Sequence, residues 1–205
     1  MVRSFVNQSV AEYEVQAREL LAQYDSLSFE SIHGEWMPFL PNRVEKVLDI
    51  GAGSGRDARW FADRSARVVA VEPCAEFRKL AQGKSTSAPI EWSSSSLPSL
   101  VNISGRFDMI LVSAVLMHIP ASSLREVFHR LNELLGVNGL LVVTLRHGPS
   151  PRGRTMVEHD DQSIITAAIK EGIGLVAVRK SEDFLSRHEV KWSTFVMKSL
   201  DADWS

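Results

Sequence analysis

Three alternating glycines flanked by two acids are the residues in this sequence whose types and spacing most directly predict chemistry. Gly51, Gly53 and Gly55 follow an apolar run that contains Asp49, and Glu72 ends the next apolar run. Glycine is used where the backbone takes a positive φ or where a ligand lies too close for a Cβ atom. We therefore expect this turn to seat a cofactor, with a carboxylate on each side of it.

The spacing of the glycines distinguishes between two kinds of cofactor. A dinucleotide-binding turn reads G-x-G-x-x-G, with a third glycine that lets the helix pack on the strand. Here the third glycine comes one residue early, and Arg56 stands where that pattern needs glycine. Together with Asp49 and Glu72, the run Val47–Asp57 resembles motif I of class I S-adenosylmethionine-dependent methyltransferases.

The resemblance assigns different parts of S-adenosylmethionine to the two acids. An ionised carboxylate only accepts hydrogen bonds, so Glu72 suits the two ribose hydroxyls; the alternative is an ordinary solvated acid at a strand end. Asp49 is implied to hold the amino-acid end, often through water; the alternative is a structural carboxylate that orders the turn. The other positions implied to bind the cofactor are Ala52, Ser54, Arg56, Asp57, Pro73, Ser94, Ser95, Leu97, Ser113, Ala114 and Met117, besides the three glycines.

Some of these implied positions keep an alternative. Family members usually offer an acid or amide to the adenine amino group after the third strand, whereas this chain has Ser94 and Ser95 there, so the adenine contact stays open. Asp57, at the predicted start of a helix, is also explained by the favourable interaction of an acid with the helix dipole. Asp57 is therefore a supporting site in this prediction.

The run Ser113–His118, after the predicted fourth strand, resembles motif IV of methyltransferases that act on small molecules. Amino-group methyltransferases of DNA bases carry Asp/Asn-Pro-Pro-Tyr at this place, and this chain does not. His118 is the candidate general base, because the ordinary pKa of histidine lies near neutrality. The alternative is that His118 caps or shapes the acceptor site without taking a proton.

Two further groups of residues are expected to face the methyl acceptor. The segment 146–154 contains arginines and a histidine but no acid, so it favours an acceptor with a carboxylate or phosphate. Alternatively, its arginines pair with acids of the next segment, namely Glu158, Asp160 and Asp161. The residues predicted to contact the acceptor are Tyr13, Tyr24, His33, Trp36, Arg146, His147 and Arg154.

These residues need a scaffold that brings strand ends together. Apolar runs alternate with segments of helical spacing, which predicts an α/β, Rossmann-like, doubly wound and mostly parallel sheet with helices on both faces. Ser123 and Glu126 have capping-box spacing, and Asn138-Gly139 predicts a turn into the fifth strand. Seven strands are predicted, the last one antiparallel: Lys46–Ile50, Val68–Val71, Ile90–Trp92, Phe107–Val112, Leu140–Leu145, Leu175–Arg179 and Val190–Met197.

The chain before the first strand is predicted to form a helical cap. Apolar residues recur on one face between Ser9 and Asp25, and an aromatic-rich stretch follows from Leu27 to Leu40. Residues 1–42 are predicted to form a helical cap or lid. The stretch Leu27–Leu40 is expected to pack against the sheet, with a lid over the ligand crevice as the alternative. Residues 43–205 are predicted to form the cofactor-binding domain.

The composition fits an ordinary globular protein and argues against several partner classes. The 205 residues are 44% hydrophobic and 23% charged, and their formal net charge of -2 gives no overall attraction to nucleic acid or to an anionic membrane. The single cysteine excludes an internal disulfide, and no Cys/His spacing predicts a metal site. The chain start lacks an apolar leader and no apolar run is long enough to span a bilayer, so we expect a cytoplasmic protein.

The wider resemblance is to small bacterial methyltransferases of unassigned substrate. It extends over Tyr24, Ser28-Phe29-Glu30, the run 114–120, the run 145–149 and Trp192. It implies methyl transfer from S-adenosylmethionine to a small-molecule acceptor, with S-adenosylhomocysteine as the product. The alternatives are a regulatory protein that binds the cofactor without catalysis and a nucleic-acid methyltransferase; a nicotinamide-dependent oxidoreductase fits worst. The sequence predicts no oligomeric state.

Overall fold

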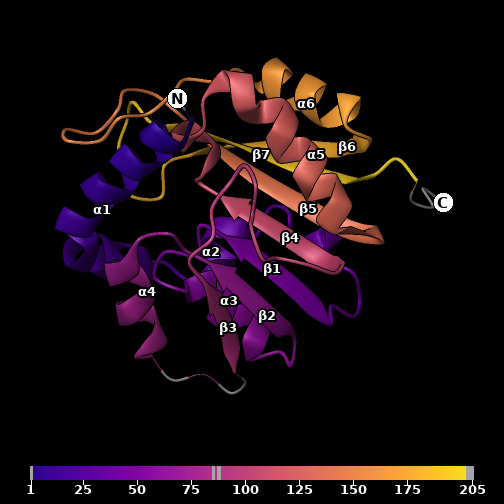
Figure 1. Cartoon of the computed structure of the whole chain (residues 1–205), viewed down its shortest axis with the longest axis horizontal. Helices are drawn as coiled ribbons and strands as arrows, with labels where there is room; N and C mark the ends of the chain where they lie inside the picture. Colours follow the sequence, from indigo (N-terminus) through magenta and orange to yellow (C-terminus); the bar gives the residue numbers. More distant parts are fainter. Residues whose placement is uncertain (1, 85, 87–88, 202–205) are drawn as a thin grey trace.

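One seven-stranded mixed sheet forms the centre of the protein, for which we describe residues 2–84, 86 and 89–201 of a computed structural model (Figure 1). The strands are β1 Lys46–Ile50, β2 Arg67–Val71, β3 Ile90–Ser93, β4 Phe107–Ser113, β5 Leu135–His147, β6 Ile173–Glu182 and β7 Lys191–Ser199. Their order is β3-β2-β1-β4-β5-β7-β6. Strand β7 pairs antiparallel with β5 and with β6, and the other pairs are parallel. The predicted fold class is confirmed.

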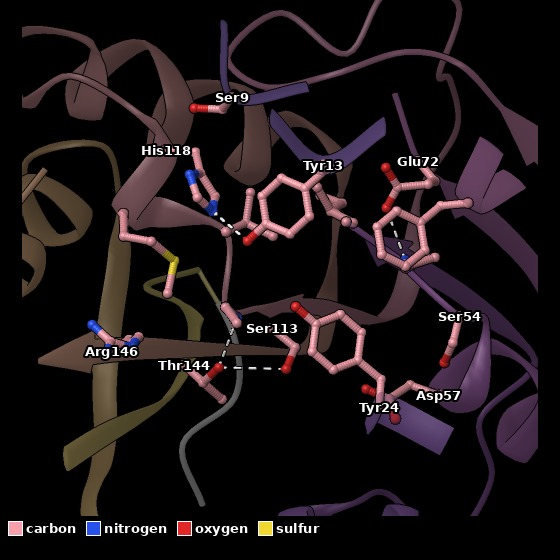
Figure 2. Close-up of a pocket in the computed structure, with 18 of the residues that line it drawn as sticks. Ser9, Tyr13, Tyr24, Ser54, Asp57, Glu72, Ser113, His118, Thr144 and Arg146 are labelled. Atoms are coloured by element: carbon pink, nitrogen blue, oxygen red, sulfur yellow. Dashed lines mark hydrogen bonds between the residues drawn. The ribbon is translucent and has the colours of Figure 1, made fainter. Parts of the chain in front are cut away.

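The carboxyl ends of the parallel strands meet at one edge of this sheet. Strand β1 lies between β2 and β4, so the chain winds in opposite directions on its two sides. Ligands of open α/β sheets bind at such a reversal point. The edge therefore gathers side chains that follow different strands, among them Glu72 after β2, Ser113 on β4 and Arg146 on β5 (Figure 2).

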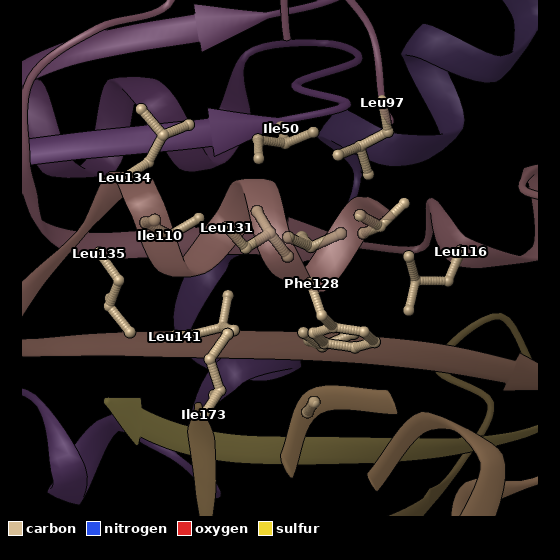
Figure 3. Close-up of a cluster of buried hydrophobic side chains, with 14 of the residues drawn as sticks. Ile50, Leu97, Ile110, Leu116, Phe128, Leu131, Leu134, Leu135, Leu141 and Ile173 are labelled. Carbon is tan, nitrogen blue, oxygen red and sulfur yellow. The ribbon is translucent and has the colours of Figure 1, made fainter. Parts of the chain in front are cut away.

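Helices cover both faces of the sheet, and the strands are consequently buried on both sides. The helices are α1 Val2–Asp25, α2 Phe29–His33, α3 Arg56–Ala62, α4 Ala75–Gln82, α5 Leu124–Leu134 and α6 Asp161–Lys170. On β4, Ile110 packs in the cluster that includes Phe128 of α5 (Figure 3), whereas Met109 packs in the cluster that includes Phe61 of α3. Two-sided burial explains why the strands read as continuous apolar runs.

Two local predictions on this side of the sheet are wrong. Strand β5 begins at Leu135 and continues through the expected Asn138-Gly139 turn, with a register shift opposite β4. A Cβ on Gly139 would lie 2.8 Å from the Phe107 carbonyl oxygen, so glycine permits close strand pairing there. Ser123 makes no side-chain capping bond, because it ends a short 3-10 turn with φ -103° and ψ -4° rather than in extended backbone.

The N-terminal helix α1 packs against α4 beside the ligand edge. Ala17 and Leu20 are buried together with Phe77, and the rings of Tyr24 and Phe77 stack at 6.1 Å. Further along, Phe29 belongs to the cluster around Phe61 beneath the sheet. Helix α1 therefore lies where its side chains can form one wall of a site at the strand ends (Figure 1).

Among the residues described, no helix combines the length and apolarity that a membrane span requires. The same part of the chain contains no group of three or more His, Cys, Asp or Glu side chains arranged to hold a metal ion.

Candidate functional site

A cavity of about 250 Å³ opens at the carboxyl edge of the sheet. Its wall combines α1, the glycine turn, the end of β2, the segment 113–119, the end of β5 and the loop between β6 and β7. Polar groups from these segments face one another across it, as Figure 2 shows. The cavity has two halves: a first half at the ends of β1 and β2, and a second half between α1, β5 and the β6–β7 loop.

The glycine turn of the first half is held by backbone hydrogen bonds to the neighbouring strand. The amides of Gly51 and Ala52 donate to the Val71 carbonyl oxygen at 2.8 and 3.0 Å. Gly51 has φ +73°, and a Cβ there would lie 2.4 Å from Cγ2 of Val115. Positive φ and close approach both require glycine at this position. The turn thus keeps backbone close to the cavity.

Glu72 is fixed against this turn with part of its hydrogen-bonding capacity unused. Its Oε2 accepts the Gly53 amide at 2.8 Å, and its Oε1 accepts the Cys74 amide at 2.9 Å. Burial raises the pKa of the Glu72 carboxyl, and these two backbone hydrogen bonds act in the opposite direction. An ionised carboxylate offers roughly four acceptor sites. Each oxygen can therefore accept one more hydrogen bond from a ligand in the cavity that Glu72 lines.

Asp49 lies directly behind the turn and is 1% exposed. Burial raises the pKa of its carboxyl well above the ordinary value, and the nearby Asp57 and Glu72 add to the effect. Its Oδ2 atom is buried with no hydrogen-bond partner among the described residues. A buried carboxyl oxygen without a hydrogen-bond partner destabilises the fold unless a ligand or a water molecule supplies that partner.

Asp57, in contrast, is fully paired. Arg56 donates to its two oxygens at 2.6 and 3.0 Å, and His33 Nε2 lies 2.9 Å from Oδ2. Although burial raises the pKa of the Asp57 carboxyl, His33 and Arg56 hold it well below its usual range. Arg56 also donates to the Tyr24 carbonyl oxygen, which ties the end of α1 to the glycine turn. Both Arg56 and Asp57 line the cavity.

Three residues predicted to contact the acceptor lie elsewhere, and we correct those predictions. His33 and Trp36 are 0% and 1% exposed, and the Trp36 indole donates to His33 Nδ1 at 3.0 Å, so both belong to the core beneath Asp57. His147 Nε2 lies 2.6 Å from the hydroxyl of buried Ser193 and 3.1 Å from Asp161, away from the cavity wall. In each case the polar atoms are already used to join neighbouring elements.

In the loop predicted to face the adenine, the structure brings a different pair to the cavity. Leu97 lines the wall as expected, together with Ser96, whereas Ser94 and Ser95 do not. Gly55 also lies off the wall, against the Trp92 side chain. Because these serines are consecutive, their spacing does not indicate which hydroxyl faces the cavity.

The second half of the cavity depends on polar side chains from distant segments. Tyr13 of α1 lies 3.1 Å, oxygen to Nε2, from His118, and Arg154 Nη1 donates to the same hydroxyl at 3.4 Å. Arg146 is 8% exposed; its Nη atoms donate to backbone carbonyls in the segment 148–149, and its Nε has no partner among the described residues. The predicted wall residues Pro73, Ser113, Ala114 and Met117 also line the cavity.

Some wall residues were missed by sequence reasoning. Ser9 lies one helical turn before Tyr13, so the helical periodicity that identified Tyr13 also indicated Ser9. Thr144 accepts the Ala114 amide at 2.9 Å, and no motif marked it. The β6–β7 loop contributes wall residues that were not predicted to contact a ligand: Asp183, Phe184 and Arg187.

Comparison with known proteins agrees with this geometry. Residues 47–139 match the family described as methyltransferase domain. An uncharacterized methyltransferase of Mycobacterium tuberculosis is 32% identical over 113 residues, which are 55% of this chain and 56% of that protein. A putative methyltransferase of a Geobacillus species is 26% identical over 131 residues, 58% of this chain and 53% of that protein. The chain thus spans about half the length of the curated relatives it matches.

Solved structures share the fold across nearly the whole chain. A Burkholderia thailandensis 1,6-didemethyltoxoflavin-N1-methyltransferase, with its acceptor and S-adenosylhomocysteine bound, superimposes with a TM-score of 0.77 over 99% of this chain and 91% of that one, at 16% identity. A Leishmania major S-adenosylmethionine-dependent methyltransferase gives 0.77 over 95% and 83%, at 14% identity. Residues 47–139 therefore match the methyltransferase domain family, and the chain shares the fold of these S-adenosylmethionine-dependent methyltransferases.

Proposed function

We propose that the chain binds S-adenosylmethionine in the first half of the cavity and transfers its methyl group to a small molecule in the second half. The observation that carries this proposal is the pairing of Glu72 with the glycine turn. A carboxylate already oriented by the Gly53 and Cys74 amides keeps acceptor capacity for a vicinal diol. The related fold of a protein with bound S-adenosylhomocysteine supports the choice of cofactor.

The residues present fit the rest of the cofactor. Gly51 and Ser113 both line the cavity where the amino-acid end would lie, and the unpaired Oδ2 of Asp49 gives that end, or a water bound to it, a partner behind the turn. Apolar Leu97 and Phe77 line the cavity where a flat base would lie. When bound, the cofactor supplies a methyl group on a positively charged sulfur.

The chain's own part in the reaction is alignment and the exclusion of water. Methyl transfer is an in-line displacement at carbon, and well-oriented groups gain on the order of 7 to 11 kcal/mol from proximity. Tyr13 and Tyr24 come from α1, which covers the strand ends, and they face the segment Ser113–His118 across the cavity. We propose that α1, within the predicted cap of residues 1–42, acts as this cover.

We further propose that the acceptor is anionic. Arg146 and Arg154 both line the second half of the cavity. Two of the acids that were candidate partners for these arginines are engaged elsewhere: Asp160 caps α6 through Ser163, and Asp161 pairs with Lys180. Guanidinium groups that line a cavity without a carboxylate partner favour a negatively charged ligand.

Calorimetric titration of the full chain tests the proposed cofactor. S-adenosylhomocysteine should bind with a stoichiometry of one, and NAD should give no binding heat, because the glycine spacing departs from the dinucleotide pattern. Binding of NAD, or no binding of S-adenosylhomocysteine, would overturn the proposal. Transfer of labelled methyl from S-adenosylmethionine to small carboxylates then separates an enzyme from a protein that only binds the cofactor.

A further inference from the structure

The second half of the cavity contains a buried hydroxyl–imidazole pair that cofactor binding does not require. The Tyr13 hydroxyl and His118 Nε2 are 3.1 Å apart, and their rings meet edge to face with centroids 5.3 Å apart. Both residues line the cavity. Figure 2 shows His118 between Ser9 and Tyr13, with the Tyr13 hydroxyl directed at the imidazole.

The third member of the cluster is compatible with a hydrogen bond donated by Tyr13 to His118. Arg154 Nη1 lies 3.4 Å from the Tyr13 oxygen, and a guanidinium only donates. The Tyr13 oxygen is therefore an acceptor toward Arg154, and its own hydrogen is free to point at His118 Nε2. When the Tyr13 hydroxyl donates to His118, Nε2 is bare and the ring hydrogen lies on Nδ1, which is buried without a hydrogen-bond partner among the described residues.

The cluster is held in place by a contact between distant segments. Glu12, next to Tyr13 on α1, accepts the Thr155 amide at 2.8 Å and the Thr155 hydroxyl at 3.0 Å. This bidentate contact fastens the loop that carries Arg154 onto α1. The hydroxyl, the imidazole and the guanidinium thus come from three segments that meet only in the folded chain.

The surroundings keep His118 in its neutral, proton-accepting form. Burial lowers the pKa of His118 to about 4, and the positive charge of Arg154 acts in the same direction, while Glu12 opposes it. The polar side chains of Tyr24 and Ser9 also line the cavity. At neutral pH the imidazole is therefore uncharged.

We propose that Tyr13 takes the proton of the methyl acceptor and passes its own proton to His118, so that the acceptor is a hydroxyl or N–H group that must lose a proton. This inference rests on the proposed function. The acceptor atom forms a bond to the methyl carbon while the carbon–sulfur bond breaks, and sulfur keeps that electron pair. The acceptor's proton moves to the Tyr13 oxygen, the Tyr13 proton moves to Nε2, and the imidazolium later releases it to water.

The total charge of the cavity does not change along this route. The sulfonium loses its positive charge in the step that creates the imidazolium, so the number of positive charges in the cavity stays constant. Arg154 opposes a second cation beside it, so the imidazolium releases its proton readily afterwards. In this scheme Tyr13 is the catalytic residue, because its hydroxyl faces the acceptor, and His118 acts through it.

The tautomer of His118 tests the inference without a known acceptor. Nitrogen-15 spectra of histidine-labelled full chain, recorded with and without S-adenosylhomocysteine, distinguish a bare Nε2 from a protonated one. We expect bare Nε2 and a hydrogen on Nδ1. His118→Gln assigns the signal, and exposed His188 serves as the internal reference. Tyr13→Phe should remove the hydrogen-bond shift of Nε2, whereas Arg152→Gln, exposed in the loop that carries Arg154, should leave it unchanged.

Each measurement supports or overturns the proposed proton transfer from Tyr13 to His118. A hydrogen on Nε2 in the bound chain, or a Tyr13→Phe spectrum identical to that of the parent, would overturn the inference, because Tyr13 could not then pass a proton to that atom. The titration midpoint of His118 should rise in Arg154→Gln, since a nearby positive charge is removed. Failure of S-adenosylhomocysteine to bind would count against the proposed function alone, because the ligand-free spectra still report the tautomer.

Discussion

The two halves of the cavity are lined by different kinds of group: mainly backbone in the first half and side chains in the second. The first half consists mainly of backbone: a glycine turn hydrogen-bonded to the next strand, with Glu72 held by two amides. The second half consists of side chains from α1, the segment 113–118 and the loop 146–156, which meet across more than a hundred residues of sequence, as in the contact of Tyr13 with His118. Under the proposed function, cofactor binding would rest on local geometry, and acceptor choice would rest on long-range contacts.

The largest expected effect tests the first half. Glu72→Ala removes the carboxylate proposed to bind the ribose and leaves the Gly53 and Cys74 amides without their acceptor. Charged hydrogen bonds contribute about 1.5 to 3 kcal/mol, so S-adenosylhomocysteine should bind about tenfold more weakly or worse, as calorimetry measures. Glu91→Ala, an exposed acid on β3, is the matched control. Equal affinities in the two variants would contradict the ribose role.

The next effect tests the second half. Arg154→Gln should raise KM for an anionic acceptor about tenfold by the same magnitudes, while the affinity for S-adenosylhomocysteine changes little. Arg152→Gln, exposed in the same loop, is the matched control. A variant that loses cofactor affinity instead would show that the two halves are not separable.

A smaller effect links the first half to stability. The raised pKa of Asp49 in the folded chain means that ionised Asp49 destabilises the fold. This destabilisation is absent near pH 3.9, about the pKa of Asp in the unfolded chain, and it grows as pH rises toward the pKa in the folded chain. Asp49→Asn should therefore raise the melting temperature by a few degrees near pH 8 and by less near pH 5, at about 2 to 4 °C per kcal/mol. Calorimetry should show weaker cofactor binding. A gain in melting temperature that becomes smaller as pH rises would contradict the destabilising effect of ionised Asp49.

The smallest expected effect on cofactor binding is that of a substitution at Trp36, which lies outside both halves of the cavity. Trp36→Phe leaves His33 Nδ1 buried without its donor, at roughly 1 to 3 kcal/mol of stability, so thermal denaturation should occur at lower temperature. Affinity for S-adenosylhomocysteine should not change. A change in acceptor KM with unchanged stability would restore Trp36 to the acceptor site.

The sequence predicted the first half of the cavity better than the second half. The fold, the glycine turn and the position of Glu72 were readable because they depend on neighbouring residues and on strand periodicity. The placement of His33 and Trp36 was not, since aromatic spacing is the same whether a side chain joins the core or a cavity. Ser96 instead of Ser95, and Thr144, depend on the twist and register of strands, which no local pattern encodes.

A crystal structure of the chain with S-adenosylhomocysteine tests the central claim most directly. The account predicts both ribose hydroxyls within hydrogen-bond distance of the Glu72 carboxylate and the sulfur facing the half of the cavity that contains Tyr13 and His118. A nucleoside bound away from the ends of β1 and β2 would contradict it.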